Sequence, residues 1–223
     1  ELLAHALHEL TARKKPLQFR AVNCAAIPDT LLESELFGHE RGAFTDATVR
    51  RVGKFEAVGE GTILLDEVGD LSPAGQAKLL RVLNGDPINA VGGNTNIIVK
   101  ARVIAATSKD LAECVKNGSF RPDIYHRLAE FVVNLPPLRD RMEDIPVLAR
   151  YFLSLLKHKN NILPPDILHT LMTHTWPGNV RELENCMRRY AALGSLDILC
   201  TSPKTHIHTS QVASLEEIKK NHI

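Results

Sequence analysis

The 223-residue sequence has few of the features that mark membrane, secreted or strongly basic proteins. Its longest apolar runs, at 63–65 and 103–106, are far shorter than the roughly 20 residues that span a bilayer. Lys plus Arg is 27 and Asp plus Glu is 26, so the net charge of +1 gives no global field that would attract nucleic acid. We therefore expect no membrane segment, and any contact with DNA must be local.

Cysteine is scarce, and the spacing of the cysteines does not indicate a metal site or a set of disulfides. The four cysteines lie far apart and form no CxxC pair, and the ten histidines contain no HExxH motif. Reduced thiols in a cytoplasmic protein fit this pattern best. The sequence also begins at Glu1, without Met, within an amphipathic helical pattern, so we expect a fragment of a longer protein.

Helical and extended patterns alternate over the first 138 residues, which predicts an α/β domain with a parallel sheet. Ser72 and Pro73 have the residue types of an N-cap and a first helical position. The Gly- and Asn-rich segment 84–96 is predicted to be irregular. The predicted strands are 19–22, 62–67, 100–107 and 131–135, and the predicted helices are 1–13, 31–37, 72–83 and 111–116.

After Pro136 and Pro137 the pattern becomes purely helical, so we expect a small helical domain over 139–195. Asn179 followed by Glu182 resembles a capping box at the start of its last helix. Residues 196–223 read as a linker and the first turns of another helix. The predicted core stripe of the first helix in this domain consists of Val147, Leu148, Tyr151, Phe152, Leu155 and Leu156.

The strongest local motif is an apolar run that ends in Asp66 and Glu67. Open α/β sheets bind ligands at the carboxyl ends of their strands, which is where these two acids lie. In a nucleotide hydrolase the first acid can hold Mg²⁺ and the second can polarise the attacking water. A strand that simply ends in two solvated acids explains the hexapeptide equally well.

Six motifs in fixed order indicate a family. Together they closely resemble the AAA+ domain of bacterial enhancer-binding proteins, the sigma-54-dependent activators, over residues 1 to about 195. The motifs are LLESELFGHERGAFTDA (31–47), GTILLDEVGDLSPAGQAKLLRVL (61–83), RVIAATSKDL (102–111), FRPDIYHRL (120–128), LPPLRDRMEDI (135–145) and WPGNVRELEN (176–185).

This resemblance implies an AAA+ P-loop NTPase-type sheet with helices on both faces, followed by a helical lid. It implies ATP and Mg²⁺ as cofactors and a homo-oligomeric ring, usually a hexamer. The family uses ATP hydrolysis to remodel the closed promoter complex of the sigma-54 RNA polymerase holoenzyme.

The resemblance assigns roles around the two acids. Asp66 matches the Mg²⁺-binding acid, and Glu67 matches the acid that polarises water. Asn23 matches the asparagine that restrains this glutamate, although a strand-end Asn that satisfies backbone groups is the plainer alternative. Thr107 matches the sensor-I position, and Ser108 follows where the family usually has Asn.

Three arginines match residues that contact nucleotide in the family. Arg121 and Arg127 match the arginines that one subunit presents to its neighbour's ATP, a role suited to a planar and always charged donor. In a monomer both would be ordinary surface residues. Arg181 matches sensor II in the lid, and on spacing alone it is a solvated helix residue.

Gly42, Ala43, Phe44, Thr45, Asp46 and Ala47 read GAFTDA where the sigma-54-contacting loop of the family usually reads GAFTGA. The resemblance implies a mobile loop tip that presents Phe44, whereas a loop Phe packed into the core is the default for an unknown protein. Asp46 replaces a glycine, which adds a charge and restricts the backbone. Segment 84–96 corresponds to a second loop that supports the first.

No GxxxxGK phosphate-binding motif is present in the sequence. Glu1, Leu2 and Leu3 resemble the residues that follow the P-loop lysine, which makes Glu1 a candidate nucleotide neighbour. Residues 214–223 resemble the start of the Fis-type helix-turn-helix domain that reads enhancer DNA. We therefore expect these 223 residues alone to bind ATP poorly and not to bind specific DNA.

The leading hypothesis is the ATPase module of a sigma-54-dependent transcriptional regulator. An alternative, motivated by Asp46 and Ser108, is an AAA+-fold oligomerisation or DNA-binding scaffold that does not activate sigma-54. Another type of AAA+ remodeller is a third hypothesis, which the GAFTDA and SELFGHE motifs disfavour. The sequence leaves open whether a phosphorylated receiver, a ligand sensor or no regulatory domain precedes Glu1.

Overall fold

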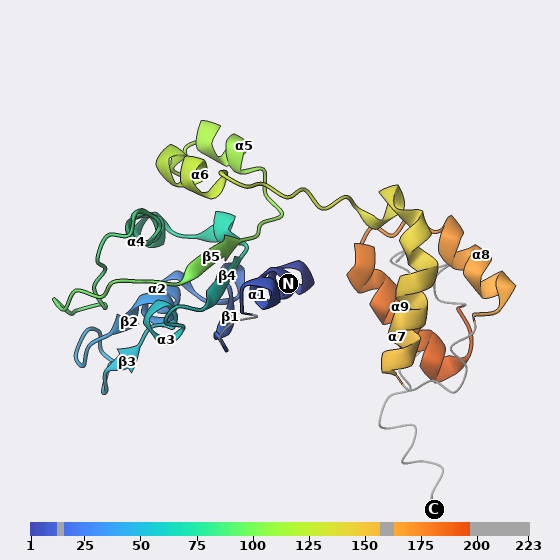
Figure 1. Ribbon diagram of the computed structural model, residues 1–223, viewed down its shortest axis with the longest axis horizontal. Helices are drawn as coiled ribbons and strands as arrows, with labels where there is room; N and C mark the ends of the chain where they lie inside the picture. Colours follow the sequence, from blue (N-terminus) through green and yellow to red (C-terminus); the bar gives the residue numbers. More distant parts are fainter. Residues whose placement is uncertain (13–15, 157–162, 197–223) are drawn as a thin grey trace, which may run out of the picture. The chain divides into compact units, whose positions relative to one another are not determined.

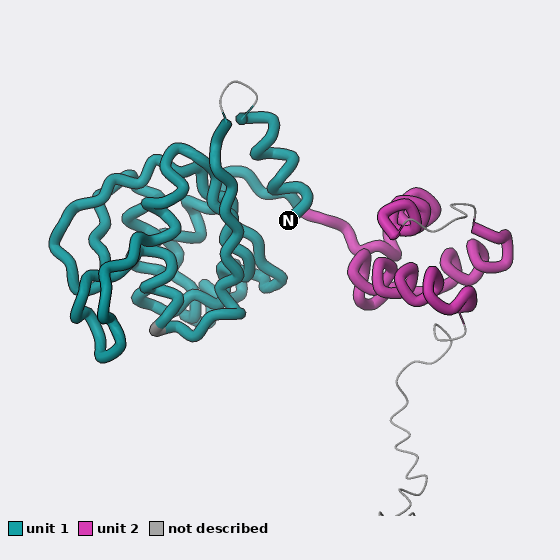
Figure 2. Tube along the Cα trace, turned by 90° about the horizontal axis from the view of Figure 1, so that it is seen from below, with its two compact units in different colours: residues 1–133 teal, residues 134–223 magenta. Residues whose placement is uncertain are grey.

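The computed structural model describes residues 1–12, 16–156 and 163–196, and it divides into two compact units. Unit 1 comprises Glu1–Val133 and unit 2 comprises Asn134–Ile223 (Figure 2). The predicted linker and truncated helix at 196–223 lie, apart from residue 196, outside the described residues. None of the described helices is long and apolar enough to cross a membrane.

Unit 1 is built on a three-stranded parallel sheet, as the alternating pattern predicted. The strand order is β1 (Phe19–Asn23), β4 (Thr62–Asp66) and β5 (Arg102–Ala105), so β4 lies in the middle (Figure 1). The four residues of β4 before Asp66, at 62–65, are all buried, as expected for a strand that is covered on both faces.

Side chains of β4 alternate between the two faces of the sheet. Ile63 and Leu65 belong to the main hydrophobic core of unit 1, in which Leu36 and Leu79 are also buried. On the opposite face the Thr62 hydroxyl lies 3.0 Å from Nδ1 of His8, a buried residue of the first helix. Helices therefore cover both faces, which confirms the predicted α/β class.

The helices of unit 1 follow the sequence pattern closely. Helix α4 begins as predicted: the Ser72 hydroxyl accepts a hydrogen bond from Gly75 N at 3.2 Å, and Pro73 occupies the first turn. The α-helices are α1 (Leu2–Ala12), α2 (Asp29–Phe37), α3 (Lys54–Ala57), α4 (Pro73–Asn84), α5 (Leu111–Lys116) and α6 (Pro122–Leu128). The short elements are η1 (Cys24–Ala26), β2 (Gly38–His39), β3 (Arg51–Val52) and η2 (Val68–Asp70).

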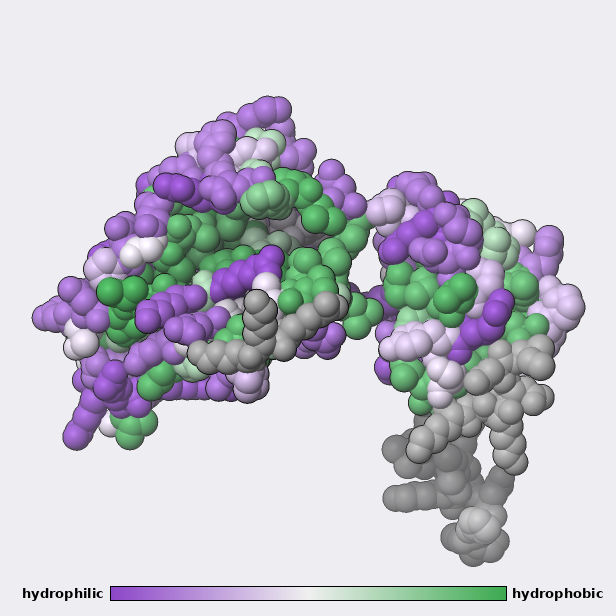
Figure 3. All heavy atoms as spheres, in the orientation of Figure 1, coloured by the Kyte–Doolittle hydropathy of each residue, from purple (hydrophilic) through white to green (hydrophobic). Residues whose placement is uncertain are grey.

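The predicted strand at 131–135 is wrong. This apolar run has no regular structure, and Phe131 is 91% exposed, with Val132, Val133 and Leu135 also exposed. Residues that alternate or cluster as in a strand form one only when a neighbouring strand pairs with them. Within the described chain β5 pairs only with β4, and Figure 3 shows hydrophobic residues gathered on the face of unit 1 around this edge.

Unit 2 is a helical bundle, as predicted. Its core is built around Trp176, which is fully buried and donates a 2.9 Å hydrogen bond from Nε1 to Leu171 O. Leu183 and Met187 pack in the same cluster. The elements are η3 (Leu138–Asp140), η4 (Met142–Asp144), α7 (Ile145–Leu155), α8 (Pro165–Thr173) and α9 (Asn179–Leu193).

The predicted stripe of α7 is only partly right. Phe152 is buried and Leu148 packs against the core, but Val147, Tyr151 and Leu155 are exposed. The buried face is instead completed by Ile145, Ala149 and Leu153. Because α7 is apolar on two adjacent faces, periodicity alone could not decide which face is buried.

Helix α9 should carry much of the stability of unit 2. Leu183→Ala removes a fully buried side chain and should lower the free energy of unfolding of this unit by about 2–5 kcal/mol. Trp176 is the only tryptophan in the sequence, so its fluorescence during urea denaturation reports on unit 2. Leu193→Ala, on the same helix but 64% exposed, is the matched control and should change the free energy by less than about 0.5 kcal/mol. Equal midpoints for the two variants would contradict the described core.

Candidate functional site

The carboxyl ends of the three strands meet at one edge of the sheet. Asn23 is the register partner of Asp66, and Leu65 is the partner of Ala105. The pairing continues past β5, because Ala106 N donates to Leu65 O at 2.8 Å and Ala106 O accepts from Val68 N at 3.0 Å. The segment 106–109 is thus fixed beside the segment that follows β4, and this edge is the candidate site.

Glu67 is the most constrained residue at this edge. Its backbone is left-handed (φ 52°, ψ 48°), a conformation that non-glycine residues adopt only when their surroundings impose it. Its carboxylate accepts hydrogen bonds from Ser108 N at 3.0 Å and from the Ser108 hydroxyl at 3.0 and 3.1 Å. The Thr107 hydroxyl approaches the same carboxylate at 3.4 Å. Side chain and backbone together give Glu67 one defined orientation.

A glycine makes this close approach possible. A Cβ atom on Gly69 would lie 3.1 Å from the Thr107 hydroxyl and 3.2 Å from a side-chain carbon of Lys109. A larger residue at this position would require the side chains of Thr107 and Lys109 to shift by a few tenths of an ångström. The same segment is anchored on its other side by an ion pair between Lys109 and Asp70.

Three acids converge near the buried thiol of Cys24. Burial, and to a smaller extent the nearby charges of Asp66, Asp70 and Glu67, raise the pKa of Cys24 to about 12. The raised pKa keeps this thiol protonated and unreactive at neutral pH. The carboxylates of Asp66, Asp70 and Glu67 near this thiol make the edge of the sheet favourable for a cation.

The acids at this edge fit a magnesium ion. Carboxylate oxygens are the ligands that Mg²⁺ prefers, and Mg²⁺ is commonly bound by one or two carboxylates together with substrate phosphates and water. Among the described residues, the hydrogen bond on the Asp66 carboxylate comes from Glu67 N at 3.2 Å. The described residues contain no group of three or more His, Cys, Asp or Glu that could hold a metal on its own. The assignment of Asp66 as a ligand of Mg²⁺ remains a prediction, and such an ion would need further ligands such as phosphate oxygens and water.

Two predicted site arginines lie on the surface of α6. Arg121 is the N-cap residue and makes a two-pronged ion pair with Asp123, from Nε at 3.1 Å and from Nη2 at 2.8 Å. This pairing holds the pKa of Asp123 below its usual range. Arg127 lies in the last turn, 3.9 Å from Glu130. Both arginine side chains are about half exposed, which leaves them accessible to a second molecule.

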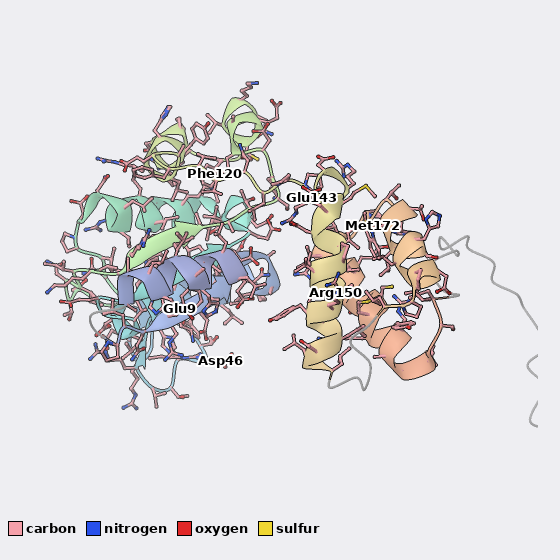
Figure 4. The ribbon with its side chains drawn as sticks, turned by 45° about the vertical axis from the view of Figure 1, so that its right-hand side comes forward. Glu9, Asp46, Phe120, Glu143, Arg150 and Met172 are labelled. Atoms are coloured by element: carbon pink, nitrogen blue, oxygen red, sulfur yellow. The ribbon has the colours of Figure 1, made fainter. Side chains whose placement is uncertain are left out.

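The GAFTDA loop is closed on itself by hydrogen bonds. Gly42 N donates to Ala47 O at 2.8 Å, and Ala47 N donates to Phe44 O at 3.0 Å. The Phe44 ring is 37% exposed and packs edge-on against His39, with 4.9 Å between ring centroids. Phe44 is therefore neither a free tip nor a core residue. Asp46 lies at the outer end of the loop (Figure 4).

The Gly- and Asn-rich segment 84–96 supports this loop, as expected. Glu40 N donates to Val91 O at 3.0 Å, and Val91 N donates to Gly38 O at 2.9 Å. Gly92, at φ 72°, lies so close that a Cβ atom there would be 2.8 Å from Cβ of Ala43. Although the segment is mostly irregular, its Ile88 forms an isolated antiparallel bridge with Ile97, the residue that follows the segment.

Comparison with known proteins places this geometry in a family. Residues 1–134 match the sigma-54 interaction domain, and residues 139–213 match the AAA+ ATPase lid domain. This chain belongs to the sigma-54 interaction domain family. It is 48% identical over 197 residues to the Nif-specific regulatory protein of Azotobacter vinelandii, covering 86% of this chain and 37% of that protein. It is also 48% identical over 198 residues to the transcriptional regulatory protein ZraR of Klebsiella oxytoca, covering 86% of this chain and 44% of that protein.

Solved structures agree with the sequence matches. A crystal structure of NtrX from Brucella abortus in complex with ADP superposes with a TM-score of 0.77 at 35% identity, covering 88% of this chain and 43% of NtrX. NtrX in complex with ATP gives a TM-score of 0.74 at 36% identity, covering 86% of this chain and 44% of NtrX. The chain thus spans less than half the length of these relatives. The predicted family and the AAA+ fold with a helical lid are confirmed.

The structure brings together most of the residues that the motifs indicated around Glu67. Asp66, Thr107 and Ser108 contact or adjoin it, and Asn23 lies opposite Asp66 in the register. The Asn23 side chain, however, makes no hydrogen bond with Glu67 among the described residues, so its assigned restraint remains a prediction. Its Oδ1 accepts from Ala25 N at 2.9 Å and from Ala26 N at 3.1 Å, so it caps η1, as the plainer alternative expected.

The two further candidates, Arg181 and Glu1, are described each within its own unit. Arg181 is exposed in the first turn of α9 in unit 2, while Val180 and Leu183 on the same helix face the core. Glu1 is exposed at the start of unit 1, where its carbonyl accepts from His5 N at 3.0 Å. Their assigned contacts with nucleotide remain predictions.

The sequence motifs gave no role to Gln76, whose side chain positions residues 119–121 ahead of α6. Its side chain is 2% exposed, and its amide nitrogen donates to Leu71 O at 2.9 Å and to Ser119 O at 3.0 Å. Its amide oxygen accepts from Arg121 N at 3.0 Å. Figure 4 shows neighbouring Phe120 in the layer between α4 and the α5–α6 pair. The sequence does hold a sign of this role, because Gln76 is a polar residue on the apolar face of α4. A buried side-chain amide is normally found only where hydrogen bonds satisfy it.

Gln76→Leu should release the segment before α6. The change leaves two carbonyls and one amide without partners, which should destabilise unit 1 by about 2–4 kcal/mol. Hydrogen exchange of the Arg121 amide should become at least about tenfold faster, as loss of about 1.4 kcal/mol of protection requires. Gln18→Leu makes the same chemical change at an exposed position and should leave this amide unchanged. Unaltered exchange in Gln76→Leu would contradict the described bonding.

Proposed function

We propose that this chain is the ATP-hydrolysing module of a sigma-54-dependent transcriptional activator. The observation that carries the proposal is the pair Asp66 and Glu67 at the carboxyl edge of the sheet, with the Glu67 carboxylate oriented by Thr107 and Ser108. Membership of the sigma-54 interaction family supports the coarser statement, and the NtrX complexes with ADP and ATP support nucleotide as the ligand class.

The two acids have different roles in the proposed hydrolysis. Asp66 would hold Mg²⁺ against the phosphates, and the ion supplies neutralisation of the phosphate charge. Glu67 polarises the attacking water and accepts its proton at a carboxylate oxygen. Arg121 and Arg127 serve the site of a neighbouring copy, where guanidinium groups stabilise the charge that spreads over the transferred phosphoryl group. This role requires a homo-oligomer, for which the ring of the family is the expected form.

The GAFTDA loop is the proposed output. Phe44 contacts the sigma-54 RNA polymerase holoenzyme, and to present its whole ring it has to leave its contact with His39. Arg181 acts as the nucleotide sensor of the lid, and Glu1 lies next to the phosphate-binding segment. A further domain of the longer protein would bind enhancer DNA.

Removal of the Glu67 carboxylate tests the hydrolytic role. Glu67→Ala, in the longest natural protein that contains these 223 residues, should lower kcat for ATP hydrolysis by about 100-fold or more, the usual contribution of a positioned proton acceptor. Binding of a fluorescent ATP analogue should change little, because this side chain acts on water. Glu113→Ala removes an exposed carboxylate from α5 and should leave kcat unchanged. Turnover of Glu67→Ala at the wild-type rate would remove Glu67 from the mechanism.

Replacement of Phe44 tests the output. Phe44→Ala in the same protein should abolish transcription from a sigma-54 promoter in vitro while ATP hydrolysis stays within about twofold of wild type, since the side chain lies in the loop and not at the sheet edge. Val49→Ala, at a 69% exposed position beyond the loop, is the control and should activate normally. If the unmodified protein hydrolyses ATP but activates no sigma-54 promoter, the scaffold alternative motivated by Asp46 is correct instead.

A further inference from the structure

The turn before α9 in unit 2 has two residues in the left-handed region of backbone conformation. Trp176 has φ 49° and Asn179 has φ 52°. Asparagine tolerates this region better than most side chains do, whereas a residue as bulky as tryptophan is rarely found there. Such a turn persists only when the surrounding contacts impose it, so these contacts indicate what the turn is built to hold.

The backbone of this turn is satisfied without the Asn179 side chain. Gly178 is the N-cap residue of α9, and its amide donates to Oε2 of Glu182 at 2.7 Å. The Trp176 amide donates to Nδ1 of His174 at 3.0 Å. The capping box expected from Asn179 and Glu182 is therefore only half right. Glu182 does bind the amide of the N-cap residue, but Asn179 is the first residue of the helix itself.

The Asn179 side chain instead binds a residue far away in the sequence. Its Oδ1 accepts a hydrogen bond from Leu138 N at 2.8 Å, across 41 sequence positions. Leu138 begins η3, so its amide is one of the donors at a helix start that have no partner within the helix. Nδ2 of Asn179 adds a longer contact of 3.4 Å with Pro177 O. The stronger of the two bonds is thus the one that joins α9 to η3.

Leu138 is the point at which the chain enters the core of unit 2. The unit begins at Asn134, and residues 134–137 have no regular structure. Leu138 is fully buried in the same cluster as Leu183 of α9. The core holds its side chain, and Asn179 holds its amide. The entering chain and the first turn of α9 are therefore fixed to each other.

Arg181 lies in that first turn, two residues after Asn179. Its side chain is exposed, whereas Val180 and Leu183 face the core. The direction of an exposed side chain depends chiefly on the backbone that carries it, so the placement of this turn decides where the guanidinium points. We infer that Asn179 is a positioning residue for Arg181, and that its bond to Leu138 N fixes Arg181 relative to the chain that enters unit 2. This inference rests on the proposed role of Arg181 as a nucleotide sensor.

Two substitutions separate the side-chain bond from the backbone conformation. Asn179→Gly adopts the left-handed conformation freely but loses the acceptor, whereas Asn179→Asp keeps an acceptor oxygen and tolerates the same backbone. In the longest natural protein that contains these 223 residues, Asn179→Gly should raise the Kd of a fluorescent ATP analogue about three- to tenfold, as loss of one hydrogen bond allows. Asn179→Asp should bind as the wild type does. Asn185→Gly, at an exposed position of the same helix, is the matched control and should also bind normally.

Arg181→Ala is measured in parallel to show whether Asn179 acts through Arg181. This variant should weaken binding of the analogue, and Asn179→Gly added to it should weaken binding no further, because the side chain that it positions is gone. A further loss in the double variant would overturn the inference. If Arg181→Ala weakens binding and Asn179→Gly does not, the inference is wrong and the proposed sensor role stands. If Arg181→Ala binds as the wild type does, the sensor role falls and the inference falls with it.

A second measurement needs no nucleotide and uses the 223-residue chain. Hydrogen exchange of the Leu138 amide should be at least about fivefold faster in Asn179→Gly than in the unmodified chain, and unchanged in Asn179→Asp. The Trp176 amide donates to His174 instead, so it should exchange at the same rate in all three chains. Equal acceleration of both amides in Asn179→Gly would make Asn179 a residue of general stability and overturn the inference. An unaltered Leu138 amide in that variant would overturn it as well.

Discussion

The backbone pairing that fastens segment 106–109 beside the end of β4 is the constraint on which the candidate site depends. Two hydrogen bonds at Ala106 carry the parallel register beyond the last strand residue, and the Thr107-Ser108 segment thereby reaches Glu67. Without this register the acids would remain a solvated strand end, the plainer interpretation of the hexapeptide. The backbone pairing at Ala106 thus determines which side chains reach Glu67. The absence of a side chain at Gly69 leaves space for Thr107 and Lys109.

The sequence was sufficient to predict the three strands of the parallel sheet, four of the helices of unit 1 and the place of Asp66 and Glu67 at a strand end. Burial of Thr62 to Leu65, the Ser72 cap and the boundaries of α5 depend on local patterns, which act over a few residues. The outcomes at 131–135 and on α7 depend on which surfaces meet a partner. A run of apolar residues carries no information about whether another strand or helix is present to cover it.

The candidate site shows the same division. The apolar run before Asp66 and Glu67 placed these two acids at a strand end, whereas Thr107 was indicated by the family resemblance. The contacts of Ser108 and Gln76 join residues 41 to 45 positions apart in the sequence and depend on tertiary placement, so no local pattern contains them. The Asn23 side chain illustrates the reverse, because its cap on Ala25 and Ala26 is a local contact that the sequence alone could suggest.

The outer side of β5 has a consequence for handling the protein. In the described chain this strand has a neighbour on one side only, and Phe131 and Val132 expose large apolar side chains. Unpaired backbone groups beside bare hydrocarbon form a template for adding strands from other molecules. These 223 residues should therefore self-associate more as their concentration increases, and mild detergent or a low protein concentration should reduce this association.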